Sequence, residues 1–224
     1  MTIAPAIRDA STLILLRGEG ANTRVLMGQR GAKAAFMPNK FVFPGGALDQ
    51  ADRDFAPAVS MPAPLAARLG AEAPPYLATP LALAAVRELW EETGLRLAMP
   101  SDPRPGPVPD AWQGFCRDGF APALGALSFI FRAVTPPGRP RRFDARFFVA
   151  RAEALASDPD DFSGADAELS HLHWIDLQAA RDLELPFITE VVLSELEARL
   201  ADSRPDRPVP YFHHDAHRSH FSLL

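Results

Sequence analysis

The chain has 224 residues, of which 47% are hydrophobic, and a formal net charge of −5 at pH 7. This length and apolar content suffice for a sizeable core in one domain, so no second domain is needed. The acidic balance argues against a nucleic-acid partner, because surfaces that bind nucleic acid normally carry a basic excess.

Cysteine content and apolar runs bear on the compartment. The lone cysteine, Cys116, excludes an internal disulfide and is typical of a reducing compartment, where it is interpreted as a small buried apolar residue. The apolar run 13–16 is too short for a signal peptide core and is predicted as a strand. Since no segment approaches a transmembrane span, we expect a cytoplasmic protein with no membrane partner.

The pattern of apolar residues predicts a mixture of strands and helices, and hence an α/β fold. Polar turn residues at 135–140 predict a hairpin end between two of the strands. Three helices are predicted, at 81–93, 112–118 and 187–200. The predicted strands are 12–16, 24–28, 41–43, 127–134, 143–150 and 172–175.

The helix 81–93 carries three carboxylates on one face. Thr79 before Pro80 predicts its N-cap, and Gly94 predicts its left-handed end. At about 100° per residue its apolar residues lie on the opposite arc. The carboxylates are Glu88, Glu91 and Glu92.

Clustered carboxylates repel one another unless a cation lies among them. Carboxylate oxygens suit Mg²⁺ or Mn²⁺, which are usually held together with substrate phosphates. The helix therefore predicts a metal site for a phosphorylated substrate, and the alternative is a solvated acidic face. Upstream, the strand 41–43 runs into Pro44-Gly45-Gly46, a turn that lets backbone carbonyls approach a ligand closely.

Together these two segments resemble the Nudix hydrolase family, whose box reads G-x5-E-x7-R-E-U-x-E-E-x-G-U, where U is aliphatic. Gly46 opens the box, and residues 87–95 close it without a mismatch. An Ala- and Pro-rich insertion at about 53–79 separates the two halves. The sequence leaves open whether Asp49 or Asp52 replaces the first acid and pairs with Arg87.

The interrupted box, Phe36-Met37-Pro38 and the stretch 141–148 resemble one branch of the family, which includes the peroxisomal coenzyme A diphosphatase. The resemblance implies an α/β/α sandwich with a mixed sheet. It also implies a single Nudix hydrolase domain over residues 1–224, with the insertion at about 53–79 and a short C-terminal tail from about 201. Dimers are common among similar proteins, so a homodimer is an expectation.

The function that this resemblance implies is Mg²⁺- or Mn²⁺-dependent cleavage of the diphosphate bond in a nucleoside diphosphate linked to another moiety. The resemblance also implies coenzyme A or acyl-coenzyme A as the preferred substrate. The alternatives are ADP-ribose, NADH or nucleoside triphosphates as substrates, or a non-catalytic, nucleotide-binding regulator. The complete set of box carboxylates weighs against the regulator.

The resemblance also assigns roles to residues. Glu168 stands six residues before Trp174, where family members often add a glutamate, and Asp166 is its rival. Arg87 is expected to orient the glutamates, and the proton acceptor is Glu88, Glu92 or Glu168. The predicted metal ligands are the Gly45 carbonyl, Glu88, Glu91 and Glu92. The predicted phosphate-binding residues are Arg30, Arg141 and Arg142.

The C-terminal segment is rich in histidine. Imidazole suits zinc, copper or nickel, so these histidines are candidates for a transition-metal site. Two simpler interpretations are favoured: a flexible end without function, or a segment that lies along the body through Tyr211 and Phe212. The histidines are His213, His214, His217 and His220.

Overall fold

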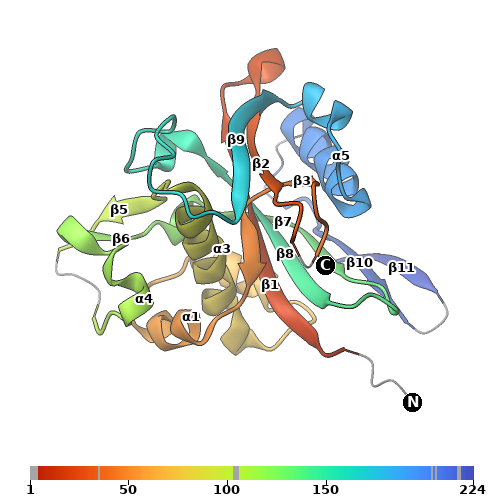
Figure 1. Ribbon diagram of the computed structural model, residues 1–224. Coiled ribbons are helices and arrows are strands. Elements are labelled where there is room, and N and C mark those ends of the chain that lie inside the picture. Colours follow the sequence, from red (N-terminus) through yellow and green to blue (C-terminus); the bar gives the residue numbers. More distant parts are fainter. Residues whose placement is uncertain (1–4, 35, 103–105, 203, 205, 216–217) are drawn as a thin grey trace.

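The computed structural model describes residues 5–34, 36–102, 106–202, 204, 206–215 and 218–224. Within them a nine-stranded mixed sheet runs through the middle of the molecule (Figure 1). Its strands are β1 (Ile7–Arg17), β2 (Arg24–Arg30), β3 (Phe41–Val42), β4 (Gly45–Ala47), β7 (Ser128–Val134), β8 (Arg142–Arg151), β9 (Leu169–Asp176), β10 (Pro210–His214) and β11 (Ser219–Leu223). The main path has the order β11-β10-β7-β8-β1-β2-β3, with β4 paired to β1 and β9 paired to β2.

Strand β1 lies in the interior of this sheet. It pairs in parallel with β8 and antiparallel with β2 and β4. Side chains alternate along a strand, so Leu13 and Leu15 enter one core cluster while Ile14 and Leu16 enter the other. All four are buried, and the continuous apolar run thus reflects a strand covered on both faces.

Helices cover the two faces of the sheet (Figure 1). Helix α3 (Ala78–Thr93) packs on β1 and β4, and helix α5 (Phe187–Ala201) packs on β7. Apolar side chains of α3 join the cluster of Leu13, whereas Val192 and Leu196 of α5 join the cluster of Ile14. This arrangement confirms the predicted α/β sandwich with a mixed sheet.

Two local predictions at helix ends are wrong. Helix α3 begins at Ala78, directly after the 3₁₀ turn Pro75–Leu77, so Thr79 lies inside its first turn and does not cap it. The helix predicted at 112–118 is the shorter α4 (Asp110–Gln113), and the segment Arg117–Gly119 after it includes Asp118 at a left-handed φ of 63°, which is not helical. Gly94 does end α3, with a φ of 77° and its N–H bonded to the Trp90 carbonyl.

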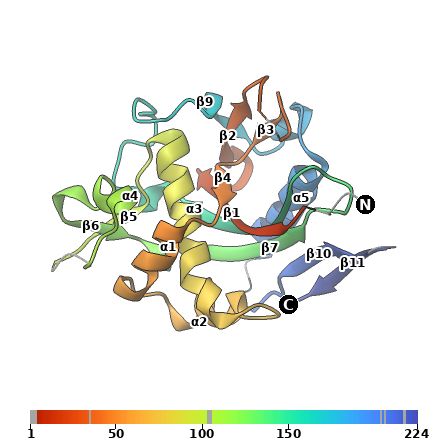
Figure 2. The ribbon, with the colours of Figure 1, turned by 60° about the horizontal axis from the view of Figure 1, so that its bottom comes forward.

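The insertion is a packed part of the core. It contains the second half of α1 (Gln50–Phe55) and all of α2 (Ala63–Leu69), which lie beside α3 in Figure 2. Phe55 and Leu65 are buried in the cluster of α3. A separate two-stranded sheet, β5 (Ala98–Pro100) with β6 (Phe120–Pro122), was not predicted.

The C-terminal segment is a hairpin that extends the sheet. Strand β10 pairs in parallel with β7, and β11 pairs antiparallel with β10. The interpretation of this segment as lying along the body is therefore confirmed, and that of a flexible end is wrong. The His213 and His220 rings stack at 5.0 Å, and His214 Nδ1 lies 2.9 Å from Ser219 Oγ. His217 lies outside the described residues.

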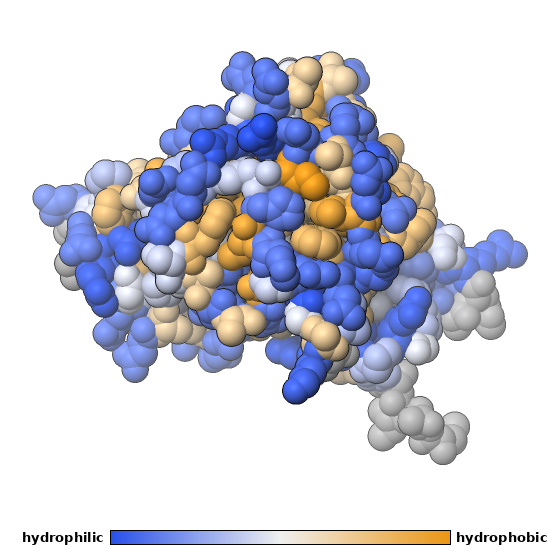
Figure 3. All heavy atoms as spheres, turned by 45° about the horizontal axis from the view of Figure 1, so that its top comes forward, coloured by the Kyte–Doolittle hydropathy of each residue, from blue (hydrophilic) through white to orange (hydrophobic). Residues whose placement is uncertain are grey.

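The surface combines apolar and polar regions. In the space-filling view of Figure 3, hydrophobic side chains gather in the middle of the face and hydrophilic ones surround them. Among the described residues, no helix is both long and apolar enough to span a bilayer.

Candidate active site

Strand β4 and helix α3 meet at the glycines of the Pro-Gly-Gly turn. The Gly45 N–H donates a 2.8 Å hydrogen bond to Glu92 Oε2. A Cβ atom on Gly45 would lie 2.6 Å from the Ser11 carbonyl oxygen, and one on Gly46 would lie 2.4 Å from Glu88 Oε1. These positions need glycine because β4 packs directly against β1 and the glutamates.

Arg87 is the buried centre of a network of carboxylates. Its Nε and Nη2 each donate a 2.9 Å hydrogen bond to Asp52, and its Nη1 lies 3.0 Å from Glu88 Oε1 and 2.8 Å from Glu91 Oε2. Burial alone would lower the pKa of Arg87, but the hydrogen bonds and charge of Asp52, with Glu88 and Glu91, raise it. These contacts agree with the orienting role predicted for Arg87.

Asp52, rather than Asp49, pairs with Arg87. Asp52 is completely buried, and it lies 35 positions from Arg87 in sequence. Asp49 instead caps α1, since its Oδ1 accepts the Ala51 N–H while Asp52 Oδ2 accepts the Asp49 N–H. The choice that the sequence left open is thus decided by the packing of α1 against α3.

Two of the glutamates are held in a way that disfavours their charged forms. Burial raises the pKa of Glu88 to about 7; Arg87 opposes this rise, and the charge of Glu91 adds to it. Burial, followed by the charge of Glu88, raises the pKa of Glu92 well above its ordinary value. Among the described residues, Glu92 Oε1 is buried with no hydrogen-bond partner. A divalent cation ligated by these oxygens would relieve both the repulsion and the missing partner, so the residues fit a metal.

The described carboxylates do not by themselves form a closed cage. No group of three or more His, Cys, Asp or Glu side chains among the described residues is arranged to hold a metal ion. Arg87 Nη1 contacts both Glu88 and Glu91, so the guanidinium bridges two of the predicted ligands.

Glu168 reaches the same site from the loop before β9. Its Oε1 accepts a 2.8 Å hydrogen bond from Arg30 Nη2. Its charge contributes to the raised pKa values of Glu88 and Glu92, after burial and the other causes given above. Its rival Asp166 turns toward the backbone, where its Oδ1 accepts the Glu168 N–H. The structure thus brings Glu168 together with the box glutamates.

A cavity of about 1300 Å³ opens beside these carboxylates. Among the predicted residues, it is lined by Arg30, Gly45, Glu88, Arg141 and Glu168. The predicted residues Arg87, Glu91, Glu92 and Arg142 do not line it. Arg142 instead donates its Nε–H to the Thr135 carbonyl at the turn between β7 and β8.

Three further cations of the cavity wall were not predicted from the sequence: Arg8, Lys40 and Arg139. The position of Arg8 could have been predicted, since strand alternation places it on the same face of β1 as Ala10 and Thr12, which also line the cavity.

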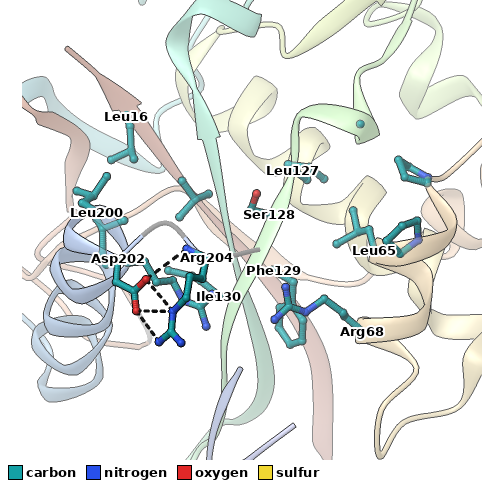
Figure 4. Close-up of a pocket in the computed structure, with 16 residues that line it drawn as sticks. Leu16, Leu65, Arg68, Leu127, Ser128, Phe129, Ile130, Leu200, Asp202 and Arg204 are labelled. Atoms are coloured by element: carbon teal, nitrogen blue, oxygen red, sulfur yellow. Dashed lines mark hydrogen bonds and ion pairs between the residues drawn. The ribbon is translucent and has the colours of Figure 1, made fainter. Parts of the chain in front are cut away.

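A second cavity, of about 400 Å³, lies between α2, β7 and the end of α5 (Figure 4). Its lining is largely apolar and includes Leu16, Leu65 and Leu127. Two of its arginines are paired: Arg204 lies 2.7 Å from Asp202, and Arg199 lies 2.6 Å from Glu195. Nothing in this arrangement calls for a charged ligand, so we assign it none.

Comparisons with known proteins bear on the identity of this site. No family model matches the chain. A curated Caenorhabditis elegans protein described as a nudix hydrolase (nudix hydrolase 7) is 29% identical over 189 residues, which are 75% of this chain and 51% of that protein. The crystal structure of a Nudix hydrolase from Alicyclobacillus acidocaldarius aligns with a TM-score of 0.64 and 26% identity, over 88% of this chain and 96% of that one. These relatives support the Nudix hydrolase family.

A third protein agrees in fold. The Nudix domain of Shewanella oneidensis NrtR, solved in complex with ADP ribose, aligns with a TM-score of 0.50 and 13% identity over 87% of this chain and 89% of that chain. An identity this low bears on the Nudix fold alone. The chain spans about half the length of the curated nudix hydrolase that it matches.

The residues that resemble the Nudix box can now be traced through the structure. Gly46 and Asp52 have the spacing of its opening glycine and first acid, and residues 87–95 at the end of α3 match the remainder. The insertion begins after Asp52 and ends near the start of α3. The Asp52–Arg87 ion pair joins the two halves of the box in space. An insertion at this point is compatible with an intact box.

Proposed function

We propose that this protein is a divalent-metal-dependent diphosphatase. Its substrate is a nucleoside diphosphate linked to another moiety, and coenzyme A or acyl-coenzyme A is preferred. The observation that carries this proposal is that Glu88, Glu168 and Gly45 line one large cavity, with Glu92 bonded to the Gly45 N–H beside them. A buried Asp52–Arg87 pair holds the helix that supplies two of these acids.

In this proposal Glu88, Glu91, Glu92 and the Gly45 carbonyl hold Mg²⁺ or Mn²⁺. When bound, the ion neutralises charge on the phosphates and lowers the pKa of a bound water. Oxygen-rich ligand sets of this kind suit both ions.

The protein's own residues position the reaction. A water molecule attacks one phosphorus, the bond from that phosphorus to the bridging oxygen breaks, and a phosphate monoester leaves. Glu88, Glu92 or Glu168 accepts the proton of the attacking water. The raised pKa values of Glu88 and Glu92 and the place of Glu168 on the same cavity make them candidate bases. Arg30 lies beside Glu168, and among the described residues its buried Nε has no partner, so it is a donor for a phosphate oxygen.

The cavity supports a large substrate. Pockets for small ligands usually measure about 300–1,000 Å³, and this one is larger, with arginines and aromatic rings along its walls. Such a lining suits a molecule that joins phosphates to an extended, partly apolar arm, as coenzyme A does. The combination of arginines and aromatic rings in this lining favours coenzyme A over ADP-ribose, the ligand in the structure of the Nudix domain of NrtR.

The decisive experiment is mass spectrometry of the products after incubation with Mg²⁺ and coenzyme A, acetyl-coenzyme A, ADP-ribose, NADH or dGTP. We expect 3′,5′-ADP and the 4′-phosphopantetheine products from the first two. Release of AMP from ADP-ribose or NADH alone would contradict the coenzyme A preference. Binding without cleavage of any compound, with Mn²⁺ also tried, would favour the non-catalytic regulator.

Metal binding should depend on pH in a defined direction. The raised pKa of Glu88, about 7, means that the metal-free folded protein holds this proton where the unfolded chain has lost it. Its folding stability therefore falls as pH rises from about 4.5 through 7, while Mg²⁺ binds the deprotonated form. Added Mg²⁺ should raise Tm at least about 3 °C more at pH 8 than at pH 5.5, equivalent to about 1 kcal/mol.

Differential scanning fluorimetry measures this difference, and NaCl at equal ionic strength controls for screening. An equal Mg²⁺ effect at both pH values would argue against Glu88 as a ligand.

A further inference from the structure

The large cavity continues far beyond the carboxylates, across one face of the sheet. Its floor is a row of cross-strand partners that all line it: Ala47 pairs with Ala10, Ala10 with Ala145, Ala145 with Ala133, and Ala133 with Phe212. Strands are about 4.8 Å apart, so these four steps span about 19 Å. We call this row, from Ala47 to Phe212, the alanine trough.

Aromatic and aliphatic side chains form the walls of the alanine trough. Phe143 on β8 packs edge-on against Phe36 at 5.5 Å, and Phe187 at the start of α5 lies 6.5 Å from Phe212. All four rings line the cavity, as does Ile188. The cavity thus has Glu88 and Arg30 beside the box. At the C-terminal hairpin it has Phe187 and Phe212, with His214 and Ser219 at the rim.

This lining discriminates between classes of ligand. A methyl-lined floor has no partner for a hydroxyl group, and a buried polar group without a partner costs about 1–3 kcal/mol. A hydroxyl group of a sugar or a nucleoside is therefore disfavoured where it would face this floor. An alkyl chain instead gains from burial, by about 0.8 kcal/mol for each methylene, or about fourfold in affinity.

We propose that the alanine trough binds an elongated apolar group attached to the diphosphate of the substrate, and that Phe212 is a specificity-determining residue. The proposal rests on the proposed function only for the position of the diphosphate. Two facts select this occupant over a separate ligand: the trough belongs to the same cavity as Glu88 and Glu168, and it starts at Ala47, next to Gly46 of the box.

The test uses alkyl esters of ADP with methyl, butyl and octyl chains and a methylene group in place of the bridging oxygen, so that they bind without being cleaved. Isothermal titration calorimetry with Mg²⁺ gives Kd for each. We expect the octyl ester to bind at least about tenfold more tightly than the methyl ester, with the butyl ester between them. Octyl and methyl esters of equal affinity would overturn the proposal.

Variants test whether the dependence of affinity on chain length arises in the alanine trough. Phe212→Ala should lower the octyl-to-methyl affinity ratio at least about threefold, and Ala145→Leu should bring it close to one by filling the floor. The matched control is Leu223→Ala, because Leu223 lies on the same hairpin, is 63% exposed and does not line the cavity. Thermal unfolding of each variant verifies its fold.

A wild-type ratio in both trough variants, each folded, would also overturn the proposal. Hydrolysis of the oxygen-bridged methyl ester is measured separately. Its absence would count against the diphosphatase, while the Kd series would still decide the alanine trough.

Discussion

Replacing Glu92 by Gln is expected to lower kcat/KM about 10²–10³-fold, because a ligand of the proposed metal loses its charge. The fold should persist, since glutamine keeps an oxygen that can accept the Gly45 N–H. Burial, with the charge of Glu88, raises the pKa of Glu92, so ionisation of Glu92 at neutral pH opposes folding. Without metal, the Gln variant should therefore be at least as stable as the wild type at pH 8.

The measurements are steady-state kinetics with the best substrate and thermal unfolding with and without Mg²⁺. Glu190→Gln is the matched control, because Glu190 is an exposed glutamate on α5, and it should retain wild-type kinetics. Glu91→Gln should lose most turnover as well. Wild-type rates in both the Glu91 and the Glu92 variants would disprove the metal-site assignment.

The second large effect is expected on stability, from Asp52→Ala. This change leaves the guanidinium of Arg87, which is 6% exposed, without its bidentate partner and removes one half of the α1 capping box. Breaking a buried ion pair usually costs about 3–5 kcal/mol. We expect a loss near 3 kcal/mol in the free energy of unfolding, because Glu88 and Glu91 still contact Arg87.

Urea denaturation measures this loss. Asp54→Ala provides the control on the same helix, since Asp54 is exposed and bonds to Gln50, and it should change stability by less than about 0.5 kcal/mol. If Asp52→Ala cost no more than this control, Asp52 would not be the structural partner of Arg87. Activity should also fall in Asp52→Ala, because Arg87 orients the box glutamates.

Local sequence was enough to determine the parts of the molecule that depend on neighbouring residues. The helix with Glu88, Glu91 and Glu92 follows from spacing along the chain, and its end at Gly94 follows from the freedom of glycine to adopt a positive φ. The run 13–16 of β1 and the run 147–150 of β8 were visible because strand segments buried on both faces are continuously apolar.

Other features depended on contacts between residues far apart in sequence. The C-terminal hairpin owes its place to pairing with β7, and residues 210–214 contain polar histidines that obscure a strand pattern. The helices of the insertion are short, so they form through packing of residues such as Phe55 and Leu65 rather than through local propensity.

The candidate site, too, combines features set by local sequence with features set by long-range contacts. The sequence by itself determined which residue types are proposed to carry the chemistry, since the glycine turn and the acidic helix face are local patterns. Tertiary structure decided that Asp52 pairs with Arg87, that Glu168 joins the glutamates and that Arg142 lies outside the cavity. It also created the alanine trough, because cross-strand register is fixed by burial over the whole sheet, which no short segment encodes.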